Sequence, residues 1–152
     1  MILEFETQVP NIPDYNNLIA LCIDSFSNYI DRNLRETTVS IAIVSEETIR
    51  HLNAQYRSQD KVTDVLSFPL WDEASIQSLP EQILGEIMIC YNKALIQAQD
   101  LGHSIEYEIA VLCIHGLCHL IGYDHQMDDE YQKMSQVEQE LLAIVKKHYS
   151  FS

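Results

Sequence analysis

The alternation of apolar and polar residues along the chain predicts four β-strands. Residues 2–7 (ILEFET) alternate in the way that is typical of a strand with one buried face. Residues 38–44 (TVSIAIV) are rich in β-branched side chains, which favour strands. Two more strands are predicted at 62–68 (VTDVLSF), where Pro69 ends the pattern, and at 84–90 (LGEIMIC).

Apolar residues at helical spacing predict five helices. Asp14 can cap the first helix, and Gly102 and Gly122 follow two later helices at the positions where a glycine commonly ends a helix. Residues 71–80 follow neither period and are expected to form a surface loop. The predicted helices are the segment from Asp14 to Ile30 and residues 46–55, 92–101, 105–121 and 129–147.

Length and composition indicate one globular unit. The chain has 152 residues, of which 47% are hydrophobic and 21% charged, so we expect a single domain over 1–152 and exclude disorder. No apolar run reaches the roughly 18 residues that a membrane-spanning helix needs. The N-terminus lacks a basic, then apolar, signal sequence, so a cytoplasmic protein without a membrane partner is expected.

Charge limits the partners. Nine Lys and Arg against 23 Asp and Glu give a net charge of −14. Such a chain repels phosphate backbones at long range, so any recognition of nucleic acid must depend on a local cationic group. The four cysteines form no CxxC pair, which favours reduced thiols in the core.

Candidate chemistry lies in residues 113–125 (CIHGLCHLIGYDH). His115 and His119 are four residues apart, hence about 40° apart around a helix, and can grip one metal ion. Gly122 can end the helix and reverse the chain, which brings His125 towards this pair. Three imidazoles and an open position are typical of catalytic zinc, and the apolar surroundings predict that the helix is buried.

Three features of this segment leave alternatives open. The histidines could be unrelated residues of a segment that tolerates histidine. Cys118 is a rival ligand, but helical geometry points its side chain to one side of the two histidines. Metzincin peptidases have a glutamate, their general base, at the position of Gly116, and its absence argues against peptide hydrolysis by that route. Close helix packing and room for substrate would each explain this glycine.

The sequence resembles the YbeY family of bacterial, metal-dependent endoribonucleases. Residues 115–125 (HGLCHLIGYDH) and 52–69 (LNAQYRSQDKVTDVLSFP) are similar to its two longest motifs, and 84–90 is similar to a weaker one. The departures are Cys118, where leucine is usual, and Glu86, where aspartate is usual.

The resemblance implies an α+β, zincin-like fold, in which a small mixed sheet and about five helices surround a central metal-binding helix. It implies one zinc ion held by His115, His119 and His125, and a functional requirement for Arg57. The implied activity is single-strand cleavage in ribosomal RNA maturation, at the 16S 3′ end, and in ribosome quality control. The implied partners are ribosomal RNA and small-subunit proteins, with no DNA.

The segment from residue 50 to 61 supports this interpretation in part. It gathers four cationic or potentially cationic residues, Arg50, His51, Arg57 and Lys61, which without the family resemblance would be an ordinary surface cluster. Arg57 presents a planar fork that suits a phosphate. We predict Arg57 and His115 as catalytic residues, with Arg57 and Lys61 binding substrate.

Two acids are weaker candidates. Asp64, placed on the strand 62–68, and Asp124, beside His125, are either acids that support metal ligands or plain polar residues.

Two rivals to a zinc-dependent endoribonuclease remain. One is a metallohydrolase of another class, such as a peptidase that takes its base from elsewhere in the chain. The other is a ribosome-assembly factor with structural zinc, which the net charge favours because free RNA should bind such a chain weakly.

Overall fold

A computed structural model describes residues 1–30, 37–70, 83–123 and 128–151. Its four-stranded sheet has the order β1-β2-β4-β3, in which the first three strands are parallel and β3 runs antiparallel to β4 at the edge. The predicted strands are confirmed. Their bounds are β1 (Ile2–Thr7), β2 (Thr38–Val44), β3 (Val65–Pro69) and β4 (Ile83–Cys90).

Strand β3 begins three residues later than predicted and includes Pro69. Asp64 O accepts from Cys90 N and Leu70 N donates to Leu84 O, so the even-numbered residues of this segment turn their hydrogen-bonding groups towards β4. Val65, Ser67 and Pro69 therefore turn theirs to the open edge. Since no ladder bond is expected there, the missing N–H of Pro69 costs the sheet nothing.

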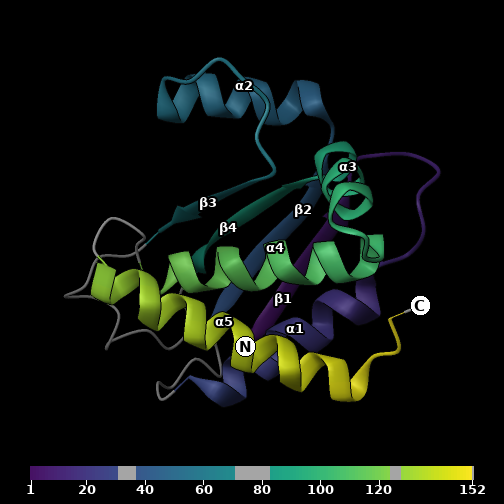
Figure 1. The fold of residues 1–152 in the computed structure, drawn as a ribbon. Helices are drawn as coiled ribbons and strands as arrows, with labels where there is room; N and C mark the ends of the chain where they lie inside the picture. The colour runs from purple at the N-terminus through teal and green to yellow at the C-terminus, as the bar shows by residue number, and fades with distance from the viewer. Residues whose placement is uncertain (31–36, 71–82, 124–127, 152) are drawn as a thin grey trace.

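The five predicted helices are also present, and they lie on both faces of the sheet. Figure 1 shows α2 on one face and α1, α4 and α5 on the other, with α4 at the centre of the molecule. Helix α4 contacts β3, β4 and the helices α1, α3 and α5. The bounds are α1 (Asn16–Tyr29), α2 (Glu46–Arg57), α3 (Tyr91–Leu101), α4 (Ile105–Leu120) and α5 (Asp128–His148).

Successive side chains of a strand point to opposite faces of the sheet, and the two faces carry separate apolar clusters. Ile41 and Ile43 of β2 point to the larger cluster, under α1, α4 and α5, whereas Ala42 and Val44 point to a smaller one under α2. Helix α4 is buried along most of its length, as its apolar composition predicts. The architecture is therefore α+β with a central helix, as expected. None of the helices in the described residues is long and apolar enough to cross a membrane.

Gly85 allows α4 and β3 to approach β4 closely. A Cβ at this position would lie 2.6 Å from Phe68 O and 2.6 Å from Leu120 Cδ2. The first of these atoms belongs to the backbone of the neighbouring strand, so it cannot move without disturbing the β3–β4 ladder.

We predict that Gly85→Ala lowers the free energy of unfolding by about 2–3 kcal/mol, because the added methyl overpacks this contact. Urea unfolding followed by circular dichroism measures the loss. Gly102→Ala is the matched control: Gly102 has φ 72° but no heavy atom within 4 Å of an added Cβ, so only backbone strain of about 1 kcal/mol is expected. An equal loss in both variants would contradict the packing argument.

Candidate active site

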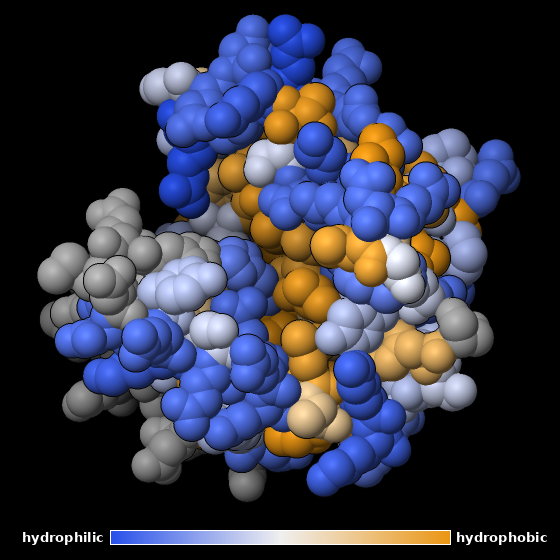
Figure 2. All heavy atoms as spheres, in the orientation of Figure 1, coloured by the Kyte–Doolittle hydropathy of each residue, from blue (hydrophilic) through white to orange (hydrophobic). Residues whose placement is uncertain are grey.

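A cavity of about 570 Å³ opens where the end of α2, the open edge of β3 and the end of α4 meet. Figure 2 shows hydrophobic residues exposed between α2 and the helices α4 and α5, with hydrophilic residues on both sides. The cavity brings together residues that are far apart in the sequence. Its lining residues are Asn53, Arg57, Gln59, Asp64, Val65, Leu66, Ser67, Pro69, His115, His119, Gly122 and Tyr123.

His115 and His119 lie one turn apart on α4, and both line the cavity. Their Nε2 atoms are 3.1 Å apart. Two nitrogen ligands about 2.0–2.1 Å from one tetrahedral zinc ion are separated by about 3.3 Å. The imidazole pair therefore suits a zinc ion, because imidazole nitrogens are common zinc ligands and the two Nε2 atoms have the right spacing.

Helix α4 ends as predicted, at a glycine. Gly122 has φ 101°, its N–H donates to His119 O, and Tyr123 N donates to Cys118 O, which is the hydrogen-bond pattern of a Schellman cap. The predicted third ligand, His125, and the candidate acid Asp124 lie outside the described residues. The residues that the structure describes contain no group of three potential metal ligands, so the three-histidine site stays a prediction.

Glu138 is a site residue that the sequence analysis missed. Its Oε2 lies 3.2 Å from His115 Nδ1, the ring nitrogen that faces away from His119. A signal for it was present: Glu138 follows Met134 by four residues and precedes Leu141 by three, so it is an acid on the apolar face of α5.

The rival ligand Cys118 faces the protein interior. Its side chain is fully buried and is absent from the cavity lining. Burial and, secondly, the charge of Glu138 raise the pKa of this thiol to about 12.

Gly116 faces the sheet. A Cβ here would lie 2.9 Å from Ile87 Cγ2 and 3.1 Å from Ser67 Oγ. Of the two explanations left open by the sequence, close helix packing is the one that the structure supports. The position leaves no room for the glutamate of a metzincin peptidase.

Arg57, the last residue of α2, reaches into the cavity. Its Nη2 donates to Ser67 O at 2.7 Å, and its guanidinium lies 5.7 Å from the centre of the Phe68 ring. The backbone oxygen on the open edge of β3 thus fixes this side chain while leaving it other N–H donors.

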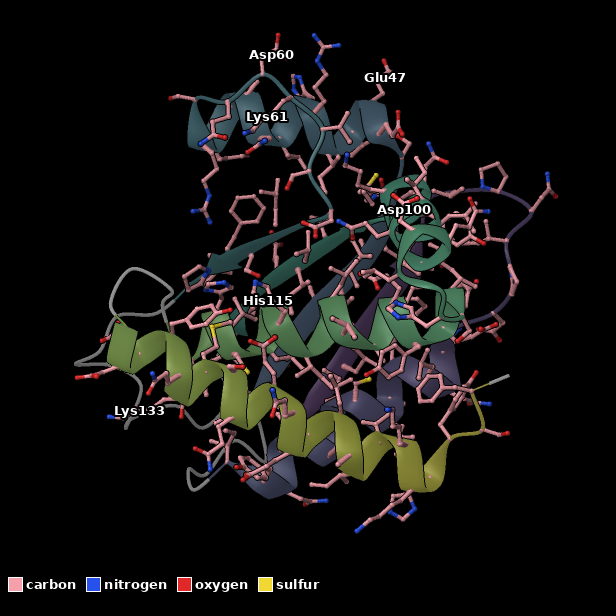
Figure 3. All side chains as sticks on the ribbon, viewed as in Figure 1. Glu47, Asp60, Lys61, Asp100, His115 and Lys133 are labelled. Carbon is pink, nitrogen blue, oxygen red and sulfur yellow. The ribbon has the colours of Figure 1, made fainter. Side chains whose placement is uncertain are left out.

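The other three residues of the predicted cationic cluster lie elsewhere. Arg50 forms an exposed salt bridge with Asp60 at 2.8 Å. His51 and Lys61 are exposed, and neither lines the cavity. Figure 3 shows Asp60 and Lys61 beside α2, at the top of the view, with His115 well below them. The structure therefore places Arg57, but not Lys61, in the cavity with the histidines.

Asp64 lines the cavity from the turn before β3, and not from within the strand as predicted. Its Oδ1 accepts from Val65 N at 2.8 Å and its Oδ2 from Gln97 Nε2 at 3.2 Å. These two donors fix the carboxylate at the cavity wall. Gln97, on α3, was not singled out from the sequence, since nothing in its local pattern links it to residue 64.

Comparison with known proteins identifies the class of the molecule. The profile of the family Endoribonuclease YbeY matches residues 3–146. The Endoribonuclease YbeY of Carboxydothermus hydrogenoformans is 36% identical over 141 residues, which cover 90% of this chain and 95% of the relative. That of Thermoanaerobacter sp. is 40% identical over 123 residues, covering 75% and 77% of the two chains.

The fold agrees with these matches. The solution structure of TM1509 from Thermotoga maritima superimposes with a TM-score of 0.66 at 26% identity, covering 97% of this chain and 91% of that one. The molecule is therefore an enzyme, a hydrolase of the endoribonuclease class. The chain belongs to the Endoribonuclease YbeY family.

We predict that Cys118 does not react in the folded protein. With a pKa of about 12, only about one thiol in ten thousand is ionised at pH 8, and the thiolate is the reactive form. Ellman's reagent should modify all four buried cysteines in urea and none within minutes in buffer. Rapid native labelling that mass spectrometry assigns to Cys118 would show instead that this side chain faces the cavity.

Proposed function

We propose that the chain, acting as a single hydrolase domain over 1–152, is a zinc-dependent endoribonuclease that cleaves single-stranded ribosomal RNA. Its place would be the cytoplasm, in maturation of the 16S 3′ end and in ribosome quality control. The observation that carries the proposal is the meeting of two imidazoles and one arginine in a single cavity.

The histidines would hold the metal. His115 and His119 are spaced for one zinc ion, and His125 is proposed as the third ligand. When bound, zinc supplies a Lewis acid that polarises a phosphoryl oxygen and lowers the pKa of water. Neutral imidazoles are needed for binding, so acid should release the metal.

Arg57 would recognise the phosphodiester. Because Ser67 O accepts from Nη2, the guanidinium is oriented before substrate arrives, and its other donors are available to a phosphate oxygen. A fixed cation near developing negative charge stabilises the transition state without reorganisation.

An aromatic pair beside Arg57 supports single-stranded substrates. Tyr56 is 60% exposed, and its ring packs edge-to-face on Phe68 at a centroid distance of 5.4 Å. An exposed ring held in place can stack on an unpaired base, which a duplex does not offer.

The net charge of −14 bears on the partners. It weakens association with free RNA, so we propose that small-subunit proteins present the ribosomal RNA to the cavity. The same charge favours the alternative of an assembly factor with structural zinc, which the cleavage experiments below separate from an enzyme. A peptidase of the metzincin type is disfavoured because Gly116, at the position of its glutamate base, packs on the sheet.

The first test concerns the metal. The purified protein should contain about one zinc ion, and His119→Ala should lose it because two imidazoles at most remain. Atomic absorption gives the zinc content, and EDTA should abolish cleavage of precursor ribosomal RNA. Full zinc content in His119→Ala would contradict the ligand assignment. An unaltered protein that contains zinc but cleaves no RNA would favour the assembly factor.

The second test concerns Arg57. Arg57→Ala should keep its fold and zinc, because arginine is no metal ligand, yet lose about a hundredfold in cleavage rate, since a positioned cation is worth on the order of 3 kcal/mol. Arg57→Lys should recover part of the rate, because a point charge lacks the two-pronged geometry.

Arg50→Ala is the matched control, since it removes the same charge from the same helix outside the cavity. Its cleavage rate should stay within about twofold of that of the unaltered protein, because Arg50 lies outside the cavity and an exposed salt bridge contributes little to the stability of the fold. Equal rates for Arg57→Ala and Arg50→Ala would remove Arg57 from the mechanism.

A further inference from the structure

We infer that Glu138, on α5, is a positioning residue that orients His115 for metal binding and thereby sets the affinity of the site. This inference rests on the zinc site of the proposed function. It assigns a role to a second helix, α5, which carries none of the predicted ligands.

The hydrogen bond at His115 decides which ring nitrogen carries the proton and which one can coordinate a metal. A neutral imidazole carries one N–H, and a carboxylate can only accept. With Glu138 Oε2 3.2 Å from Nδ1, the proton of His115 belongs on Nδ1. The lone pair then belongs to Nε2, the atom that lies 3.1 Å from His119 Nε2.

The position of Glu138 sets it apart from the other two glutamates of α5. Its side chain is 19% exposed and that of His115 is 26% exposed, whereas Glu130 and Glu140 of the same helix are exposed. A carboxylate that loses water is stable only with a compensating partner. The N–H of His115 is such a partner.

A second observation places this carboxylate in the α4–α5 interface. Helix α5 contacts α4 directly, and Cys118 of α4 is fully buried. Met134 and Leu141, on the same face of α5, are also fully buried. The apolar packing of α5 against α4 therefore holds Glu138 beside His115.

Two effects on metal binding follow. The carboxylate keeps the His115 ring from rotating. It also makes Nε2 more basic, so that this atom gives its electron pair to the metal more readily. Loss of such a partner typically weakens metal binding by about 10- to 100-fold.

The experiment compares zinc affinity in the full-length chain and three variants, by competition with a chromophoric chelator. Glu138→Ala should bind zinc about 10- to 100-fold more weakly. Glu138→Gln should lie between, because an amide oxygen still accepts the N–H but carries no charge. Glu47→Gln is the control: it makes the same chemical change at the far end of α2, as Figure 3 shows, and should bind zinc as the unaltered protein does.

A spectroscopic readout tests orientation directly. With cobalt(II) in place of zinc, the visible absorption of Glu138→Gln should shift in wavelength or intensity, because the ligand field depends on the His115 ring. Unfolding curves in EDTA show whether each metal-free variant folds. If Glu138→Ala does not fold, the affinity and spectrum of Glu138→Gln decide.

Zinc affinities and cobalt spectra equal to those of the Glu47→Gln control would overturn the role of Glu138. Failure of the proposed function looks different. A protein that binds zinc but cuts no RNA would refute the nuclease, while the affinity comparison would still judge Glu138. If the unaltered protein binds no zinc, both proposals fall.

Discussion

The close packing of α4 against the β3–β4 edge of the sheet is the constraint on which the cavity depends. Gly85 and Gly116 remove the two Cβ atoms that would hold the layers apart, each within 3.0 Å of a neighbouring heavy atom. Because α4 is anchored on this side, it can present the partly exposed His115 and His119 next to β3. A looser helix would carry the imidazoles away from Arg57, which is fixed to the same strand.

The open edge of β3 explains why the cavity forms there. Edge strands carry unpaired backbone groups that proteins must pair or cover. Here Asp64 accepts the N–H of Val65 and Arg57 donates to the carbonyl of Ser67. The side chains that satisfy the edge are thus the same polar groups that line the cavity, so one arrangement stabilises the sheet and furnishes the site.

The sequence predicted most of the elements because their periods are clear. Strand β2 lies where its β-branched residues predict it. Helix α4 ends at Gly122 as predicted, because the φ of 101° at this position is one that glycine adopts readily. The predicted start of β3 was wrong because Val62 and Thr63 continue the alternating sequence pattern, whereas the pairing with β4 begins only at Asp64 and Val65. Glu138 was missed because its place on the apolar face of α5 marks an unusual acid but does not identify the imidazole that faces it from α4.

Local geometry also resolves the conflict between the acidic chain and a phosphate-bearing substrate. The net charge of −14 acts over about a Debye length of 8–10 Å, where salt screens it. Inside the cavity the fields are set by nearer groups, and Arg57 is oriented there without a carboxylate of its own among the described salt bridges. Arg50, by contrast, is neutralised by Asp60. If Arg57 binds the phosphate as proposed, the long-range repulsion acts on the encounter with RNA rather than on the bound complex.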